Sequence, residues 1–202
     1  GVEVCGVMIG KSPNRSIPDF IIKNTKAPII CFESPNFVTD KKMKSIRIGA
    51  SLLNLLVKLP VFIKSLRLIH QKIKEYQPDV IINFYDPLIG LYYLLYQPRI
   101  PMVCVAHQYI YLHPGFEFPA GHGTERAAIK WYTRLTSIGA CKKLALSFYP
   151  INDNFKRSII AVPPLLRSEL FQIRTENKDY LLVYLLNSGY MEDIMKWHNK
   201  HP

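Results

Sequence analysis

Short apolar runs rich in β-branched residues recur along this chain, and longer stretches with helical spacing lie between them. The runs that predict buried strands are residues 2–9, 28–32, 79–85, 101–107, 144–148 and 159–162. Each run is almost continuously apolar, which is typical of strands that are covered on both faces of a parallel sheet. The alternation therefore predicts an α/β domain with a doubly wound parallel sheet.

The longest helical pattern covers residues 44–76, where Leu52, Leu59 and Leu66 belong to a series with three- and four-residue steps. Pro60 lies inside this pattern, so we expect a kink or a division into two helices. Two further helices are predicted, over residues 87–96 with Pro87 in the first turn, and over residues 124–138 with Gly123 or Thr124 as the cap.

The carboxyl-terminal part predicts a change of domain. Pro163 and Pro164 end the last strand of residues 1–166, and a charged stretch at 167–179 has the composition of a linker. Residues 180–202 then predict a new strand at 180–186, a turn at Gly189 and a helix at 191–200. We interpret this segment as the first βα unit of a second, truncated domain, and the apolar run directly after Gly1 as the inside of a fold that is incomplete at its start.

Composition limits the partners. The net charge of +11 favours an anionic partner, such as nucleic acid, anionic lipid or a phosphorylated substrate. The four cysteines lack the close spacing of metal or redox sites, which predicts buried, reduced thiols and a cytoplasmic protein. No uncharged apolar run reaches the roughly 18 residues of a membrane-spanning helix.

Six segments, taken in order, resemble GT-B glycosyltransferases, particularly the branch near the enzyme that adds N-acetylglucosamine to lipid-linked peptidoglycan precursors. They are MIGKSPNRSIPDF, PDVIINFYDPLIGLYYLL, IPMVCVAHQYIYLHP, LTSIGACKKLALSFYP, AVPPLLR and LVYLLNSGY. The resemblance implies two Rossmann-like domains across a cleft, the first holding the acceptor and the second the nucleotide-sugar. The transfer reaction that the resemblance implies requires neither a metal nor a cofactor.

The chain departs from the family pattern in two regions. The first strand with its Gly-rich loop is absent before Val2, and so is almost all of the donor domain, so this fragment alone is expected to be inactive. Where relatives have an acidic residue near the end of the strand at 79–85, this chain has Phe84, with Asp86 two residues later. A catalytic His–Asp pair is therefore not carried over.

Three polar residues follow predicted strands, where a doubly wound sheet binds its ligands. His107 and Gln108 end the strand at 101–107, and imidazole can accept a proton from a sugar hydroxyl. Alternatively, His107 caps the strand by bonding a loop carbonyl. Asp86 could orient an acceptor hydroxyl, or it could complement the dipole of the helix that begins at Pro87.

The long loop at 109–122 adds further acceptor-binding candidates, Tyr109 and His113, since aromatic and polar groups suit sugars. The spacing of His113, Glu117 and His122 fits no metal motif. On the donor side, the remaining candidates are Asn187, Ser188 and Gly189, in a turn whose N–H groups could approach a phosphate.

The region from Lys41 to Lys74 carries many basic residues beside its apolar positions, and no acidic residue lies between these two lysines. This pattern is typical of a membrane-surface helix, or of a core helix with a solvated basic face. With lipid-linked acceptors in the related branch, we expect contact with an anionic membrane at the cytoplasmic face.

The function predicted is transfer of a hexose from a nucleotide-sugar to an acceptor hydroxyl, on a lipid-linked or surface glycan. The alternatives are a nucleotide-sugar epimerase on the same fold and a non-enzymatic basic binding domain. Nucleic acid is not an expected partner, because no RNA-binding aromatic motif or helix-turn-helix is present.

One structural expectation follows from the strand order 3-2-1-4-5-6 of such sheets. If residues 2–9 form the second strand and residues 79–85 the fourth, a slot about 9.6 Å wide would separate them. An empty slot would leave buried backbone groups unpaired at about 1–3 kcal/mol each, so either the sequence is a truncated part of a longer protein whose first strand fills the slot, or residues 2–9 pair directly with residues 79–85. The backbone bonds of Val80 and Ile82 distinguish these outcomes.

Overall fold

The computed structural model describes residues 1–11, 16–36, 48–174, 176–185 and 188–201. The chain divides into two compact units. The first unit contains residues 1–35 and 60–165, and the second contains residues 36–59 and 166–202. The break after Leu165 lies beside the boundary predicted at residue 166, whereas residues 36–59 separate from the segment to which the sequence assigned them. That the second unit opens a donor domain stays a prediction.

The first unit contains two parallel sheets. The smaller sheet pairs β1 (Val7–Gly10) with β2 (Ile29–Phe32). The larger sheet has the order β3-β4-β5-β6, formed by β3 (Ile81–Asn83), β4 (Met102–Ala106), β5 (Ala140–Leu146) and β6 (Ile159–Val162). Every strand pair in both sheets is parallel, which confirms the predicted α/β class.

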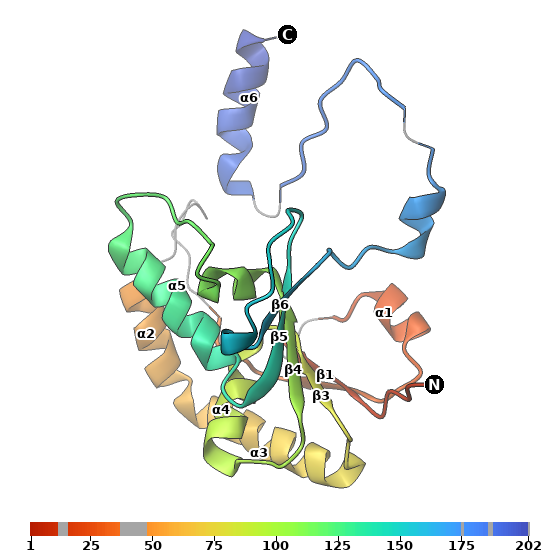
Figure 1. Cartoon of the computed structure of the whole chain (residues 1–202), viewed down its shortest axis with the longest axis vertical. Helices are drawn as coiled ribbons and strands as arrows, with labels where there is room; N and C mark the ends of the chain where they lie inside the picture. The colour runs from red at the N-terminus through yellow and green to blue at the C-terminus, as the bar shows by residue number, and fades with distance from the viewer. Residues whose placement is uncertain (12–15, 37–47, 175, 186–187, 202) are drawn as a thin grey trace. The chain divides into compact units, whose positions relative to one another are not determined.

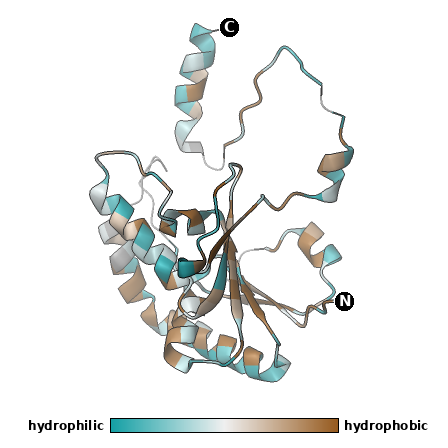
Figure 2. Ribbon diagram, viewed as in Figure 1, coloured by the Kyte–Doolittle hydropathy of each residue, from teal (hydrophilic) through white to brown (hydrophobic). Residues whose placement is uncertain are grey.

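The helices of the first unit lie on two sides of the strands. On one side lie α3 (Leu59–Tyr76), α4 (Pro87–Tyr96) and α5 (Gly123–Thr136), and on the other lies the short α1 (Asp19–Asn24) (Figure 1). Two 3-10 turns, η1 (His107–Leu112) and η2 (Phe155–Arg157), follow β4 and precede β6. Hydrophobic residues concentrate on the strands (Figure 2), and Ile69, Leu88, Met102 and Ile159 are fully buried between strands and helices.

The second unit contains α2 (Ile48–Val57), a 3-10 turn η3 (Ser168–Gln172), a second such turn η4 (Ser188–Tyr190) and α6 (Met191–Lys200). Its predicted strand at 180–186 is wrong for the described residues 180–185, which form no strand and of which 180–184 are exposed. An apolar run forms a strand only where a neighbour pairs with it, and among the described residues no strand pairs with this run.

Several boundaries match the sequence prediction. Helix α2 ends before Lys58 and α3 begins at Leu59, so the division at Pro60 is confirmed. Helix α4 and strand β6 have the predicted bounds.

Other details differ. β1 begins five residues later than predicted. β5 begins at Ala140 rather than at residue 144, because Lys142 and Lys143 interrupt the apolar pattern on which the prediction rests. The cap of α5 is His122 rather than Gly123 or Thr124, because the helix already includes both. Of the four cysteines, which are all free thiols, Cys104 is buried whereas Cys5 and Cys141 are exposed, so their predicted burial is wrong.

β1 and β3 do not pair. The Val7 N–H donates to the Pro28 carbonyl (2.9 Å) and the Ile81 N–H to the Pro101 carbonyl (3.0 Å), so each strand bonds away from the other. Within the described residues no backbone bond joins the two sheets. The alternative in which the strands collapse together is therefore wrong.

Gly90 sets how closely α4 approaches the end of α5. A Cβ atom at Gly90 would collide with the backbone carbonyl of Leu135, which cannot rotate away. We expect Gly90→Ala to lower the free energy of unfolding by about 1–3 kcal/mol, because the helices must move apart. Gly49→Ala is the matched control: a Cβ there meets open space in α2, and alanine should stabilise by about 0.5–1 kcal/mol. Urea unfolding of both variants measures this, and equal effects would contradict the close approach.

Candidate functional site

Asp86 lies in a rigid turn between β3 and α4. Its carboxylate Oδ1 accepts the N–H of Leu88 (2.8 Å) and so caps α4, whose first residue is Pro87. The Asn83 carboxamide holds the turn from the other side: Oδ1 accepts the Asp86 N–H (2.9 Å) and Nδ2 donates to the Asp86 carbonyl (3.0 Å). Tyr85, between them, has a left-handed φ of 66°. The carboxylate is therefore fixed in position.

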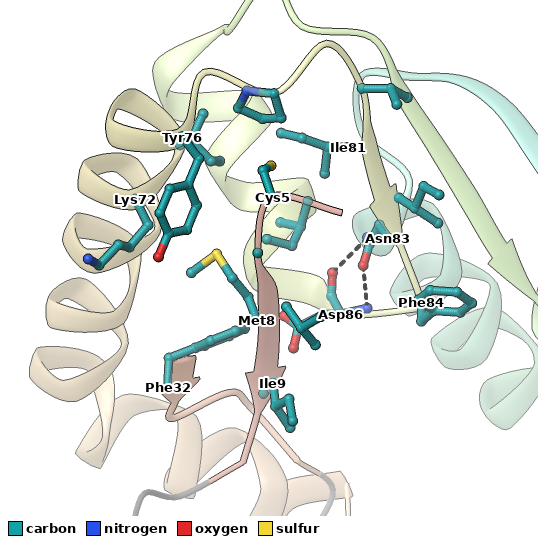
Figure 3. Close-up of a pocket in the computed structure, with 18 of the residues that line it drawn as sticks. Cys5, Met8, Ile9, Phe32, Lys72, Tyr76, Ile81, Asn83, Phe84 and Asp86 are labelled. Carbon is teal, nitrogen blue, oxygen red and sulfur yellow. Dashed lines mark hydrogen bonds between the residues drawn. The ribbon is translucent and has the colours of Figure 1, made fainter. Parts of the chain in front are cut away.

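The surroundings of Asp86 favour its neutral form. Burial raises the pKa of the carboxyl above its usual value, whereas Ser34 and the N–H groups of Leu88 and Ile89 oppose the rise. The Ser34 hydroxyl is itself buried and is close enough to favour the carboxylate, although it makes no hydrogen bond of good geometry. A Cβ atom at Gly10 would collide with the Asp86 carboxylate and with Ser34. These three residues follow or end β1, β2 and β3, so they gather at the carboxyl ends of the strands, with Asp86 between β1 and β3 in Figure 3.

His107 directly follows the carboxyl end of β4 and is the first residue of η1, and its side chain is exposed. Its Nδ1 is 3.2 Å from the carbonyl oxygen of Leu146, which can only accept a hydrogen bond, so Nδ1 carries a proton. In the neutral ring, Nε2 then has the lone pair. The ring also stacks on Phe148 at 6.2 Å between centroids. The two sequence interpretations of His107 are therefore compatible: the bond that caps the loop also prepares Nε2 to accept a proton.

The other candidates in this region divide into two kinds. Gln108 is half-buried beside His107. Tyr109 is fully buried, and its hydroxyl forms a hydrogen bond with Thr136 Oγ1 (3.1 Å). His113 is also buried, and its Nδ1 accepts the Gly115 N–H (3.0 Å). Tyr109 and His113 thus act as internal supports in this structure, and direct contact of either with an acceptor stays a prediction.

Sequence reasoning missed the internal network that supports the Asp86 turn. The Tyr85 hydroxyl forms a hydrogen bond with Thr133 Oγ1 (2.8 Å), and the Tyr85 ring lies 5.6 Å from the rings of both Tyr109 and Tyr132. Burial raises the pKa of Tyr85, so the phenol stays neutral. The available signal was Thr133 and Thr136, spaced three apart on a helix, where hydroxyls face one side.

Three aromatic rings cluster at the end of η1 and in the loop after it. Tyr111, Phe116 and Phe118 lie 4.8–5.5 Å apart, Tyr111 and Phe116 also pack against the hydrophobic core, and the Lys130 ammonium lies 4.8 Å from the Phe118 ring. Across the described segments, no three His, Cys, Asp or Glu side chains come together to hold a metal, so His113, Glu117 and His122 do not form such a group.

The donor-side candidates belong to the second unit. Asn187 lies outside the described residues. The backbone of Ser188 and Gly189 forms η4, directly ahead of α6. A turn that leads into a helix agrees with the predicted place of these residues.

Residues 36–200 match the model of the family described as Glycosyl transferase family 1. The chain belongs to this family. The match contains Asp86, His107 and the turn at Gly189, so it extends over both units. No curated protein and no solved structure matches the chain. The resemblance to glycosyltransferases is therefore confirmed, whereas the peptidoglycan-related branch stays a prediction.

As a glycosyltransferase, the chain has two groups suited to handling a hydroxyl at the carboxyl ends of its strands. One is a fixed, partly buried carboxyl with a raised pKa at Asp86, and the other is an exposed imidazole at His107. Basic Nε2 and a carboxyl that can accept or donate a hydrogen bond are the groups that acyl- and glycosyl-transfer sites use to activate and orient hydroxyls.

The raised pKa of Asp86 gives a pH-dependent stability. The unfolded chain ionises this group near its usual pKa of about 3.9, and the folded chain ionises it only at higher pH. Ionisation therefore destabilises the fold as pH rises through that interval, and the penalty is absent below it. We expect Asp86→Asn, which keeps an oxygen for the Leu88 N–H, to be more stable than the parent at pH 7. The difference should vanish near pH 3.5.

Thermal unfolding of both proteins between pH 3.5 and 7 measures this difference. A gap that widens toward acid would show that the folded state lowers the pKa. Asp153→Asn, an exposed carboxylate that accepts the Ala161 N–H, is the control and should not reproduce the pattern.

Proposed function

We propose that this chain forms the acceptor side of a glycosyltransferase that moves a hexose from a nucleotide-sugar to an acceptor hydroxyl. The observation that carries the proposal is the hydrogen bond between His107 Nδ1 and the Leu146 carbonyl, at the carboxyl end of β4. It orients an exposed imidazole with Nε2 available, in a member of a family that transfers sugars. Membership of this family favours transfer over the epimerase and the non-enzymatic binding domain.

In the proposed reaction, the acceptor hydroxyl loses its proton to His107 Nε2 as its oxygen forms a bond to the anomeric carbon. The bond from that carbon to the diphosphate breaks in the same step, and the nucleoside diphosphate leaves with the electron pair. The imidazolium that forms is stabilised by the Leu146 carbonyl, since Nδ1–H already points at it. The proton then passes to solvent, because the His107 side chain is exposed.

Asp86 serves as a positioning residue in this scheme. Its Oδ1 is engaged by the Leu88 N–H, so the remaining oxygen is the one that can bond an acceptor hydroxyl. Gln108 would add a second polar contact from the start of η1. On the donor side, Asn187, Ser188 and Gly189 would approach the diphosphate through N–H groups ahead of α6. A lipid-linked or surface glycan remains the acceptor that the resemblance favours.

The role of His107 has a direct test in the full-length polypeptide. We expect His107→Ala to lower kcat for release of nucleoside diphosphate by at least about 100-fold, with little change in KM for the donor, because the base acts on the acceptor. A panel of nucleotide-sugars with a glycan acceptor mixture is assayed by diphosphate release. His198→Ala, on an exposed face of α6, is the matched control. Unchanged kcat for His107→Ala would remove this residue from the chemistry.

We also propose that the protein contacts an anionic membrane at its cytoplasmic face. In α2, Leu53, Leu56 and Val57 are 64–71% exposed, and the helix contains no charged residue. In α3, Lys64, Arg67 and Lys74 are exposed. Lys41, Lys42, Lys44 and Arg47 lie outside the described residues. Among the helices that are described, none has the length and apolar character to cross a membrane.

This contact can be measured with vesicles. We expect binding to vesicles of phosphatidylglycerol and phosphatidylcholine that weakens as salt rises from 0.05 to about 0.5 M, since screening removes the basic contribution. The double variant Leu53→Glu with Leu56→Glu should lower vesicle binding at least about tenfold, because the two leucine side chains that are expected to insert into the lipid are replaced by charged ones. The control places the same charges at exposed Gln172 and Asn177. Equal binding to purely neutral vesicles would exclude the electrostatic part.

A further inference from the structure

A cavity of about 360 Å³ lies in the first unit, where the end of α5 meets β5 and β6 (Figure 1). Its walls contain three basic side chains from three different elements, which are Arg134 of α5, Lys143 of β5 and Arg157 of η2. The rest of the lining is Leu112, Ser137 and Ile159. No acidic residue of the described chain therefore borders this cavity.

Lys143 lies on the face of the sheet that α5 covers. It is paired with Cys104 of β4 on one side and with Ile159 of β6 on the other. Cys104 directs its Sγ to the carbonyl of Thr136 at the end of α5 (3.7 Å), and directly paired residues of parallel strands share a face. Cys104 and Ile159 are both fully buried. A lysine thus stands in an apolar stretch of the sheet, with its ammonium at the cavity.

The positive charges at the cavity lack a matching negative charge. Burial lowers the pKa of the Lys143 ammonium, and Cys104 and Cys141 partly oppose this effect. Within the segments that the structure describes, neither Lys143 nor Arg134 forms an ion pair with a carboxylate. Lysine is seldom withdrawn from water without such a partner. The carboxyl end of α5 supplies only about half a negative charge, which leaves most of the three positive charges uncompensated.

Arg157 is held in place by the protein itself. Its Nη1 donates to the carbonyl of Leu112 (2.7 Å), and its backbone N–H donates to Asn154 Oδ1 at the start of η2 (3.0 Å). A guanidinium has five N–H donors in a planar fork, and the bond to Leu112 uses one of them. The other donors are therefore positioned at little further cost in side-chain entropy.

The charge and the size of the cavity favour a phosphate group. A phosphate monoester carries about −1.5 to −2 charges near neutral pH and offers three strong acceptor oxygens, which suits three basic side chains. A carboxylate has one charge and two oxygens. The volume lies near the lower end of the range of about 300–1,000 Å³ that is usual for small-molecule sites, so the organic group attached to the phosphate is small.

We propose that Arg134, Lys143 and Arg157 form a binding site for a phosphate group, distinct from the candidate site for sugar transfer. The lining contains neither Asp86 nor His107, and the residues expected to meet the diphosphate of the donor belong to the second unit. The site does not depend on the proposed transfer reaction. The phosphate belongs either to a small soluble ester or to the headgroup of an anionic lipid, which share this chemistry.

Two neighbouring lysines of β5 give a matched test. Lys143→Met keeps an unbranched side chain and removes the charge at the cavity, whereas Lys142→Met removes the same charge from an exposed residue on the opposite face. The protein is titrated with inorganic phosphate at constant ionic strength, and amide NMR shifts give the dissociation constant. We expect Lys143→Met to raise it at least about tenfold, as for loss of one charge-assisted hydrogen bond, and Lys142→Met to change it less than about twofold.

A second pair of variants leaves the sheet intact. Arg134→Gln, at an exposed position of α5, should raise the dissociation constant at least about threefold. Arg126→Gln, also exposed and about two turns earlier on the same helix, should change it little. Equal effects within both pairs would overturn the proposal, as would the absence of saturable shifts at the amides of Lys143 and Arg157.

Vesicles distinguish the source of the phosphate. Binding to phosphatidylcholine vesicles with and without phosphatidic acid is compared for Lys143→Met and Lys142→Met, which both leave α2 unchanged. A selective loss of phosphatidic acid binding in Lys143→Met assigns the site to a lipid headgroup. Equal vesicle binding, together with selective loss of inorganic phosphate and glycerol phosphate binding in Lys143→Met, assigns it to a soluble ester. If Lys143→Met matches Lys142→Met with every one of these probes, the cavity is not a phosphate site.

Discussion

The buried carboxamide of Asn83 is the interaction on which the first unit and its candidate site most depend. Its Nδ2 donates to the carbonyl of Thr136 (2.7 Å) and to that of Asp86, and its Oδ1 accepts the Asp86 N–H. One side chain thereby satisfies the last carbonyl of α5, that of Thr136, and closes the turn that starts α4. A buried amide left without these partners would lose about 1–3 kcal/mol per group. The position of the Asp86 carboxylate follows from this arrangement.

The two groups that favour sugar transfer owe their properties to backbone contacts rather than to other charges. The Leu146 carbonyl defines the tautomer of His107, and burial with the N–H groups of α4 defines the ionisation of Asp86. Both contacts come from parallel strands that end at the same edge. A site of this kind tolerates changes elsewhere on the surface, because the sheet itself supplies the geometry.

The fold was predictable from the sequence where apolar periodicity alone defines an element, as in α4, β6 and α6. It was not predictable where pairing decides, since residues 180–185 have a strand pattern without a neighbour, and β5 contains two lysines. For the site, the positions of His107 and Asp86 after strands were predictable. The inward orientation of Tyr109 and His113 was not, because a 3-10 turn follows β4 directly, buries Tyr109, Ile110 and Leu112, and leads into His113.

Among the described residues no backbone bond joins the two sheets, which are held together by side chains. The ring of Tyr76 packs against Gly6, where even a Cβ atom would overlap it, and Phe32 and Met8 belong to the same core as Ile73 and Ile89. Gly10 and Asp86 make a second close contact at the carboxyl end. These contacts at both ends of β1 prevent the strands from moving together, since pairing β1 with β3 would require the Tyr76 ring and the Asp86 turn to be displaced. The separation of β1 from β3 is therefore a consequence of packing, because bringing the two strands together would break the core that surrounds them.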